Sequence, residues 1–168
     1  MLYRLVSYIK FLFSSTDQHG VHSPFVYDYV TKCLYQKRLS NDSKVKDVLL
    51  KSLLYFSSEN VFFEGMDMEV RKAIKKKIPS LRPNGIPYDF IYLDKLDERN
   101  ISTYILENKN THNGTVVFID GIHRNDHTYV LWKNLRNNEQ IRVTVDLFYC
   151  GLIFFRKEQA KEHFKIRI

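Results

Sequence analysis

The sequence is short of cysteine and contains no long hydrophobic run. Its two cysteines, Cys33 and Cys150, lie far apart. They fit neither a disulfide framework nor the ligand spacing of a zinc site, so a reducing cytoplasm is the expected location. No run approaches the roughly 20 apolar residues of a membrane-spanning helix. Arg4 and Lys10 interrupt the apolar stretch at 2–13, and no small-residue cleavage site follows, which excludes a secretory signal peptide.

Acidic residues are also scarce, with 19 against 26 lysines and arginines, which gives a formal net charge of +7. Such a balance raises the possibility of an anionic partner, either nucleic acid or a membrane surface. The densest basic cluster falls in an expected helix at 68–78. A run of this kind is usually a solvated face, and no known nucleic-acid motif accompanies it. Binding of nucleic acid or an anionic surface through this helix is therefore the last-ranked function.

The 168 residues suffice for one domain with a sizeable core. We expect an N-terminal helical region at 1–58, followed by an α/β core at 59–168. Helix start signals stand at Ser23-Pro24, Ser43 and Asp67. The expected elements before the core's central strands are helices at 2–13, 24–37, 44–56 and 68–78, a strand at 60–65 and a loop at 80–87.

Two matched β-favouring stretches, 88–94 and 115–120, each end in an aspartate, Asp94 and Asp120. The stretch between them is long enough for one helix, at 97–108, so the two strands should be parallel neighbours in a βαβ unit. Ligands gather at the carboxyl edge of such a sheet. A further helix is expected at 125–137. The two β-rich runs around Gly151 are close enough to pair antiparallel.

The first expected helix carries a continuous apolar stripe. Its spacing indicates an amphipathic helix that packs against the domain or against a second copy of the chain. This interpretation outweighs a membrane-surface role because the polar face is poor in lysine. The stripe consists of Leu2, Leu5, Val6, Ile9, Leu12 and Phe13.

Three segments resemble a known family. The opening at 18–27, Gln-His-Gly-Val-His-Ser-Pro-Phe-Val-Tyr, the Val-Phe-Ile-Asp-Gly-Ile-His at 117–123 and the close at 143–164 are similar to a class I S-adenosylmethionine-dependent methyltransferase-like family common in Bacteroidetes bacteria. The resemblance implies a truncated Rossmann-like methyltransferase fold. In that fold, N-terminal helices precede a mostly parallel sheet that ends in an antiparallel hairpin.

The chain departs from this family in the cofactor-binding half. Members carry a strand, a glycine-rich turn, a helix and a second strand that ends in an acidic residue, whereas this interval offers one strand ending at Glu64-Gly65 and no Gly-x-Gly pattern. Glu64-Gly65 aligns either with the first strand and a degraded turn or with the second strand and its ribose-binding glutamate. The second alignment is favoured. Glu64, Gly65 and Asp94 are the cofactor-binding residues that the resemblance implies.

The resemblance also implies candidate residues for catalysis and for a metal. Related O-methyltransferases hold a divalent metal with an aspartate after the fourth strand and an adjacent polar pair after the fifth, and Asp94 and Asp120 occupy matching positions. The second member of that pair is Gly121, which cannot ligate a metal. Lys95 directly follows Asp94, and its positive charge would repel a cation bound there. His123 is either a third ligand or a general base, so Asp120 and His123 are the catalytic candidates. Helix or loop capping by both aspartates is the favoured alternative.

Three functions follow from these observations. The first is a degenerate methyltransferase homologue with weakened or lost S-adenosylmethionine binding. The second is an active small-molecule O-methyltransferase with a minimised or dimer-completed site, in which Phe62, Tyr92 or Tyr149 stacks on adenine or on the substrate. The third is the binder of anionic partners described above. A lost βα unit would expose a sheet edge or an apolar helix face, so we also expect a homodimer formed through the N-terminal helix.

Overall fold

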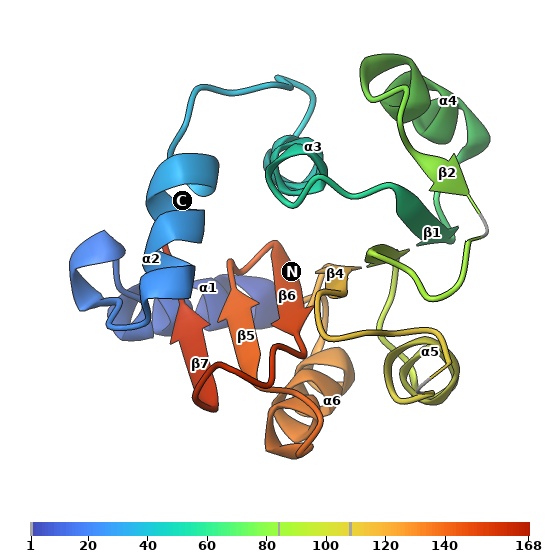
Figure 1. Cartoon of the computed structure of the whole chain (residues 1–168). Helices are drawn as coiled ribbons and strands as arrows, with labels where there is room; N and C mark the ends of the chain where they lie inside the picture. The colour runs from blue at the N-terminus through green and yellow to red at the C-terminus, as the bar shows by residue number, and fades with distance from the viewer. Residues whose placement is uncertain (1, 84, 108) are drawn as a thin grey trace.

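A mixed β-sheet organises the chain, and helices cover both of its faces (Figure 1). The computed structural model describes residues 2–83, 85–107 and 109–168, and in this part the sheet has seven strands in the order β2-β1-β3-β4-β6-β5-β7. The strands are β1 (Asn60–Glu64), β2 (Arg82–Pro83), β3 (Phe90–Leu93), β4 (Val116–Asp120), β5 (Val143–Asp146), β6 (Cys150–Phe154) and β7 (Glu162–Lys165).

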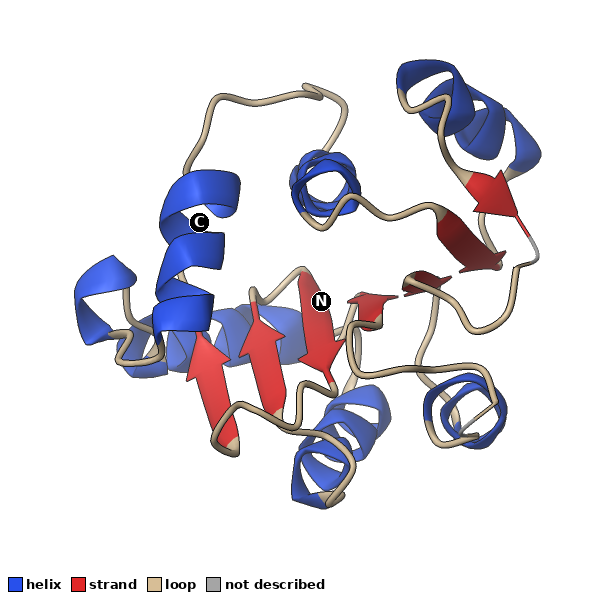
Figure 2. Cartoon of the chain, in the orientation of Figure 1, coloured by secondary structure: helices blue, strands red, loops and turns tan. Residues whose placement is uncertain are grey.

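Figure 2 shows the helices in blue, and short polar side chains precede most of them. Ser23, Ser43 and Asp67 each accept a backbone N–H in the first turn that follows, as the sequence predicts, and Asn125 caps the last helix in the same way. The helical elements are α1 (Leu2–Ser14), η1 (Gln18–Gly20), α2 (Pro24–Tyr29), η2 (Val30–Leu34), α3 (Lys44–Tyr55), α4 (Met68–Lys77), α5 (Glu98–Asn100), η3 (Ile101–Ile105) and α6 (Asp126–Asn137).

Strand alternation divides the core into two clusters. In β3, Phe90 and Tyr92 face the side of α2, α3 and α4, whereas Ile91 and Leu93 face the side of η3 and α6. Figure 1 shows the same division, with α3 and α4 on one side of the sheet and α5 and α6 on the other. Both faces are therefore buried, as expected for a sheet made largely of parallel strands joined by helices.

The predicted central βαβ unit is confirmed. β3 and β4 are parallel, with Phe90 opposite Val116 and Leu93 opposite Ile119. Asp94 and Asp120 therefore leave the sheet at the same edge. The predicted C-terminal hairpin is confirmed as well, because β6 runs antiparallel to β5 and to β4. The architecture is thus α/β with a mostly parallel sheet.

Several predicted boundaries are wrong. The expected loop at 80–87 contains β2, which pairs parallel with β1 through Arg82 and Pro83; Asn84 in that loop lies outside the described residues. The second helix ends with η2 and the fifth with η3, both earlier than predicted, and Asn108 at the predicted end of the fifth lies outside the described residues. β7, which pairs parallel with β5, has no counterpart in the prediction.

The apolar stripe of α1 does not pack against the domain, so that half of the sequence interpretation is wrong. Leu2 and Phe13 are 75% and 89% exposed, and the other four members are exposed as well. The opposite face carries the contacts, because Phe11 is buried and Tyr8 packs edge-on against Phe148. In the described part of the chain, none of the helices has both the length and the apolar character needed to cross a bilayer.

Candidate functional site

Three strands deliver an aspartate to one edge of the sheet. Asp94 follows β3, while Asp120 ends β4 and Asp146 ends β5. β5 runs in the same direction as β4, because β6 pairs antiparallel with both. The three side chains therefore gather at the carboxyl edge, where open α/β sheets place their ligand sites.

A glycine turn brings His123 back to this edge. Gly121 has a φ of +67°, which favours glycine, and its N–H donates to the Tyr149 carbonyl at 2.8 Å. Two residues later the imidazole Nε2 lies 2.9 and 3.1 Å from the two carboxylate oxygens of Asp146. Both side chains are almost completely buried. Asp146 also accepts the Phe148 N–H at 2.8 Å, so its carboxylate is held from two directions.

Aromatic rings cover both faces of the imidazole. Tyr129 stacks on one side with ring centroids 4.3 Å apart, and Phe148 stacks on the other at 4.7 Å. Phe148 adopts a φ of +68°, a conformation that costs a non-glycine residue about 1–3 kcal/mol. The packing therefore fixes the plane of the His123 ring. It does so although the backbone at Phe148 is strained.

Helix α1 supplies the remaining partner of His123. Ser7 Oγ lies 2.8 Å from Nδ1. An ionised carboxylate only accepts hydrogen bonds, so Nε2 carries the proton that is shared with Asp146, and Nδ1 accepts the hydrogen of the Ser7 hydroxyl. The result is a continuous chain of hydrogen bonds, Ser7 to His123 to Asp146, in which only Ser7 is partly exposed.

Asp120 lines a small cavity beside this chain. The cavity has a volume of about 150 Å³ and is also lined by Arg4, His123, Arg124 and Tyr149. Burial raises the pKa of the Asp120 carboxyl, and the charge of Asp94 adds to the rise; the two arginines and the hydroxyl of Tyr92, which donates to Asp120 at 3.4 Å, oppose it. The site therefore holds one carboxyl that takes up a proton more readily than usual and two permanent cations.

Asp94 and Gly65 lie against each other at the end of β1. Gly65 has a φ of +68°, and a Cβ built on it would stand 2.0 Å from the carboxyl carbon of Asp94. Asp94 Oδ1 is buried without a hydrogen-bond partner. Glu64 accepts a long hydrogen bond of 3.5 Å from the Tyr104 hydroxyl. The space beside the glycine is therefore filled by a side chain of the protein itself, which does not fit a close approach of the cofactor to this turn.

The surroundings of the predicted metal ligands, Asp94 and Asp120, include two arginines and a fully engaged histidine. Among the described residues, no group of three or more His, Cys, Asp or Glu side chains is placed to hold a metal ion. His123 has both ring nitrogens engaged, and Asp120 lies within the field of Arg4 and Arg124. The positive charges of Arg4 and Arg124 beside Asp120 oppose the binding of a cation there.

The proposed stacking residues are already covered by other aromatic rings. Phe62 packs against Tyr104 with ring centroids 4.7 Å apart and against Tyr88 at 5.3 Å. Tyr149 meets Phe148 edge-on, and Tyr92 stacks on Phe118 with ring centroids 5.8 Å apart. Each of the three rings therefore has an aromatic partner within the protein.

Most of the basic side chains of helix α4 form hydrogen bonds or ion pairs with neighbouring groups of the protein itself. Arg71 donates to the carbonyls of Phe63 and Met66 at 2.7 and 2.9 Å, and Lys75 donates to the Pro79 and Leu81 carbonyls. Lys72 pairs with Glu69, and Lys77 reaches the Leu39 carbonyl. These contacts satisfy the Phe63 carbonyl of β1, beyond its two-residue pairing with β2, and fasten the following loop, which weakens the case for an anion-binding surface.

The structure brings together some of the predicted site residues and adds others. Asp120 and His123 share one cavity, and Asp94 lies near Asp120 on one side and against Gly65 on the other, next to Glu64 at the end of β1. Ser7, Arg4 and Asp146 were not predicted. One signal for Asp146 exists in the sequence: Val143-Thr-Val-Asp146 is a third β-favouring run that ends in aspartate. No comparable signal marks Ser7.

Comparison of the chain with profiles of known protein families and with curated protein sequences finds no match.

Proposed function

We propose that this chain is a degenerate relative of the class I methyltransferases, one that keeps the fold and has lost S-adenosylmethionine binding. The observation that carries the proposal is the contact between Asp94 and Gly65. In a working site the glycine turn leaves its backbone open to the cofactor. Here a carboxylate fills that space. The cavity at the carboxyl edge beside Asp120 and Gly121, at about 150 Å³, is also smaller than the roughly 300–1,000 Å³ typical of ligand pockets.

The strand order supports the ancestry. An antiparallel strand, β6, is inserted between β4 and β5 at the end of an otherwise parallel run, as in the fold that the sequence resembles. β1 lies between β2 and β3, which suits the first strand of that fold better than the second. On this alignment the two-residue β2 is the remnant of the next strand. Glu64 would then belong to the first strand, in contrast to the alignment favoured by the sequence.

We expect titration calorimetry with S-adenosylmethionine to give no binding heat at millimolar ligand, with or without Mg²⁺. Asp94→Ala provides the matched variant, because it removes the carboxylate that lies against Gly65. If that carboxylate is the obstacle, the variant should regain measurable affinity while remaining folded by circular dichroism. Asp126→Ala, a change at an exposed position beyond the edge, is the control. Micromolar binding by the unmodified chain would overturn the proposal.

The exposed stripe of α1 supports association of two copies through this helix. Monomers rarely expose contiguous apolar patches of more than a few hundred Å². The stripe runs the length of α1, and the opposite face of the helix is fixed to the domain by Ser7 and Phe11, so the apolar side stays outward. The other expected feature of a shortened sheet, an exposed strand edge, is reduced at β1, because β2 pairs with Asn60 and Val61 and Arg71 donates to the Phe63 carbonyl.

Light scattering coupled to gel filtration should therefore report a dimer. Leu5→Glu places a charge in the stripe and should convert the dimer into a folded monomer. Ser102→Glu adds the same charge at an exposed position in η3 and should leave the dimer intact. A monodisperse monomer at high concentration would contradict this assignment.

A further inference from the structure

The hydrogen-bonded chain at the carboxyl edge has the parts of a nucleophile relay. We propose that Ser7, His123 and Asp146 activate the Ser7 hydroxyl toward small, activated acyl esters, so that the protein carries a hydrolytic activity. This activity needs neither S-adenosylmethionine nor a metal ion, and it stands or falls independently of the function proposed above.

The geometry assigns one role to each member. Ser7 Oγ and His123 Nδ1 are 2.8 Å apart, within the range for proton transfer from a nucleophile to a general base. Asp146 holds Nε2–H at 2.9 Å and stabilises the imidazolium that forms when the ring takes the serine proton. The two ring nitrogens are exchanged relative to the best-known serine hydrolases, where the carboxylate holds Nδ1. Such relays are defined by geometry and roles, so the exchange preserves the function.

The relay is organised before any substrate arrives. His123 is held between Tyr129 and Phe148, and its carboxylate partner is also fixed by the Phe148 N–H. The imidazole therefore cannot rotate away from Ser7 without breaking a stack on each face. Positive φ at Phe148 shows that the backbone is strained at the residue that completes this packing. Strain at such a position is typical of functional sites.

The neighbouring cavity indicates the substrate class. His123 lines it together with Arg4, which stands one helical turn before Ser7 on the same face of α1. A volume of about 150 Å³ admits a short acyl group and excludes a long chain from the cavity. Arg4 and Arg124 both line the cavity and give it positive charge, which stabilises negative charge that develops on a bound ester.

The reaction balances without a further reagent. Ser7 Oγ bonds to the acyl carbon while its proton moves to His123 Nδ1. The tetrahedral species then collapses, the bond to the leaving-group oxygen breaks, and that oxygen takes the proton from His123. Water, deprotonated by the same nitrogen, attacks the acyl-serine and releases the carboxylic acid and free Ser7.

A purely structural role for the same contacts would make Ser7 an anchor that fastens α1 to the domain. Both roles predict that Ser7→Ala loosens α1. Only the relay predicts that Ser7 Oγ reacts covalently faster than other serines of the same helix. Ser14 is the natural reference, because it also lies in α1 and has no histidine partner: its hydroxyl donates to the Lys10 or the Phe11 carbonyl and accepts from the Lys165 ammonium.

The test is labelling of the full chain with a fluorophosphonate, followed by peptide mass spectrometry. Phosphonylation replaces fluoride at phosphorus by Ser7 Oγ, so the expected result is one adduct, located on Ser7 and absent from Ser14. Asp146→Asn and His123→Asn should slow labelling by about 10²–10⁴-fold, the usual contribution of a positioned general base. Hydrolysis of p-nitrophenyl acetate should fall in parallel.

A second measurement covers the case in which those buried substitutions fail to fold. In Ser7→Cys, alkylation by iodoacetamide should be at least about tenfold faster than in Ser14→Cys, because a histidine partner raises the thiolate fraction. The native cysteines do not interfere, since both are buried and burial raises the pKa of the Cys33 thiol to about 12. Equal alkylation rates, or a folded protein whose Ser7 takes no fluorophosphonate, would overturn the relay.

Discussion

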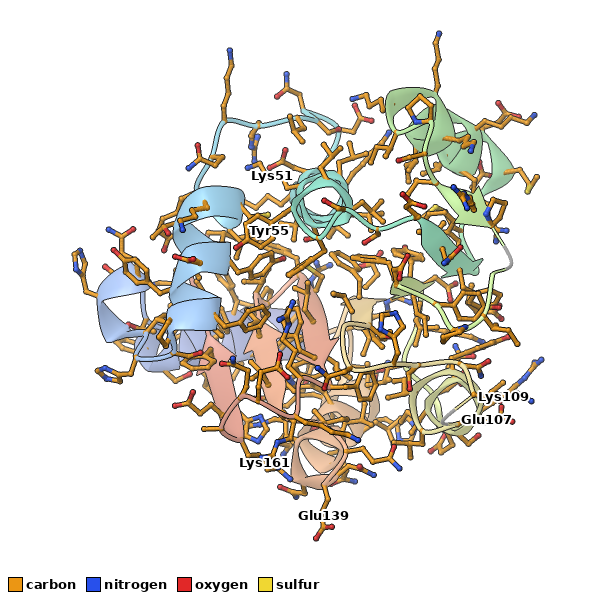
Figure 3. The ribbon with its side chains drawn as sticks, in the orientation of Figure 1. Lys51, Tyr55, Glu107, Lys109, Glu139 and Lys161 are labelled. Atoms are coloured by element: carbon orange, nitrogen blue, oxygen red, sulfur yellow. The ribbon has the colours of Figure 1, made fainter. Side chains whose placement is uncertain are left out.

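Replacing Asp47 by alanine will lower the free energy of unfolding by about 3–5 kcal/mol, the usual cost of leaving one member of a buried ion pair alone. Asp47 and Lys51, one turn apart in α3, form an ion pair of 2.9 Å with side chains only 7% and 6% exposed (Lys51 is labelled in Figure 3). The carboxylate also accepts the N–H groups of Leu39 and Ser40 at 2.6 and 3.2 Å. The substitution therefore leaves the buried Lys51 ammonium with only the carbonyls of Leu34 and Gln36 as acceptors, and it removes the acceptor that holds the linker between η2 and α3.

Chemical denaturation measures this loss, and two further observations test its origin. Burial raises the pKa of the Asp47 carboxyl, but hydrogen bonds from Lys51, Leu39 and Ser40 outweigh it, so the pKa is lowered. The stabilisation is therefore complete above the unfolded pKa of about 3.9 and is lost as the pH falls through the folded value. The difference in free energy of unfolding between the unmodified chain and Asp47→Ala should therefore become smaller in acid. The pair Asp47→Leu with Lys51→Met should cost less than Asp47→Ala alone; an equal or larger cost would contradict the ion-pair account.

Replacing Trp132 by alanine will lower the free energy of unfolding by about 3–5 kcal/mol, because it empties the largest side chain of the core. Trp132 is 1% exposed on the inner face of α6. Its indole lies directly on β6, where a Cβ at Gly151 would stand 2.7 Å from its ring and 3.0 Å from Ile122. Gly151 is thus the residue whose lack of a side chain admits the indole.

The same contact provides a compensating variant. Gly151→Val alone should be destabilising by about 1–3 kcal/mol through overpacking. Combined with Trp132→Ala it should recover part of the loss, since the new side chain enters the emptied space. Asn134→Ala, at an exposed position of α6, should change stability by no more than about 0.5 kcal/mol. Strictly additive effects of the Trp132 and Gly151 substitutions would show that the two positions are not in contact.

Local signals in the sequence located most elements of the fold. Ser23, Ser43 and Asp67 predicted helix starts that the structure confirms, because an N-cap is a short-range interaction between neighbouring residues. The pairing of β3 with β4 was equally accessible. Two β-favouring runs, separated by a stretch of helical length, permit few arrangements other than a parallel pair.

The missed elements depend on distant partners. β2 has two residues, one of them Pro83, and β7 reads Glu-His-Phe-Lys without an apolar alternation. Each is a strand only because a neighbouring strand offers it hydrogen bonds. The apolar stripe of α1 misled the prediction for a similar reason. Periodicity identified a hydrophobic face, but the contacts of the helix with the domain were decided by Ser7, Tyr8 and Phe11 on its other side.

The candidate site was half predictable. Asp120 and His123 were found because they follow a recognisable strand directly. Their hydrogen-bond partners could not be predicted from the sequence, since these partners lie far away along the chain. Asp146 is 23 positions from His123, and Ser7 is 116 positions away on the first helix. Spacing along the chain carries no information about such meetings, which arise only when the whole sheet is assembled.

Contacts between the N-terminal and the C-terminal segments affect how the protein folds during its synthesis. Thr16 pairs with Ile166 next to β7, and Phe25 packs on Phe154 with ring centroids 5.0 Å apart. The last contacts of α1 and α2 therefore form only after residue 166 has been made, although Tyr29 of α2 meets Ser52 of α3 much earlier. At about 5–20 residues per second, synthesis of residues 35–166 takes on the order of ten seconds, during which part of the apolar surface of α1 and α2 stays uncovered. We expect nascent chains of this protein to depend on chaperone binding at residues 2–34, and C-terminally truncated chains that lack β7 to aggregate.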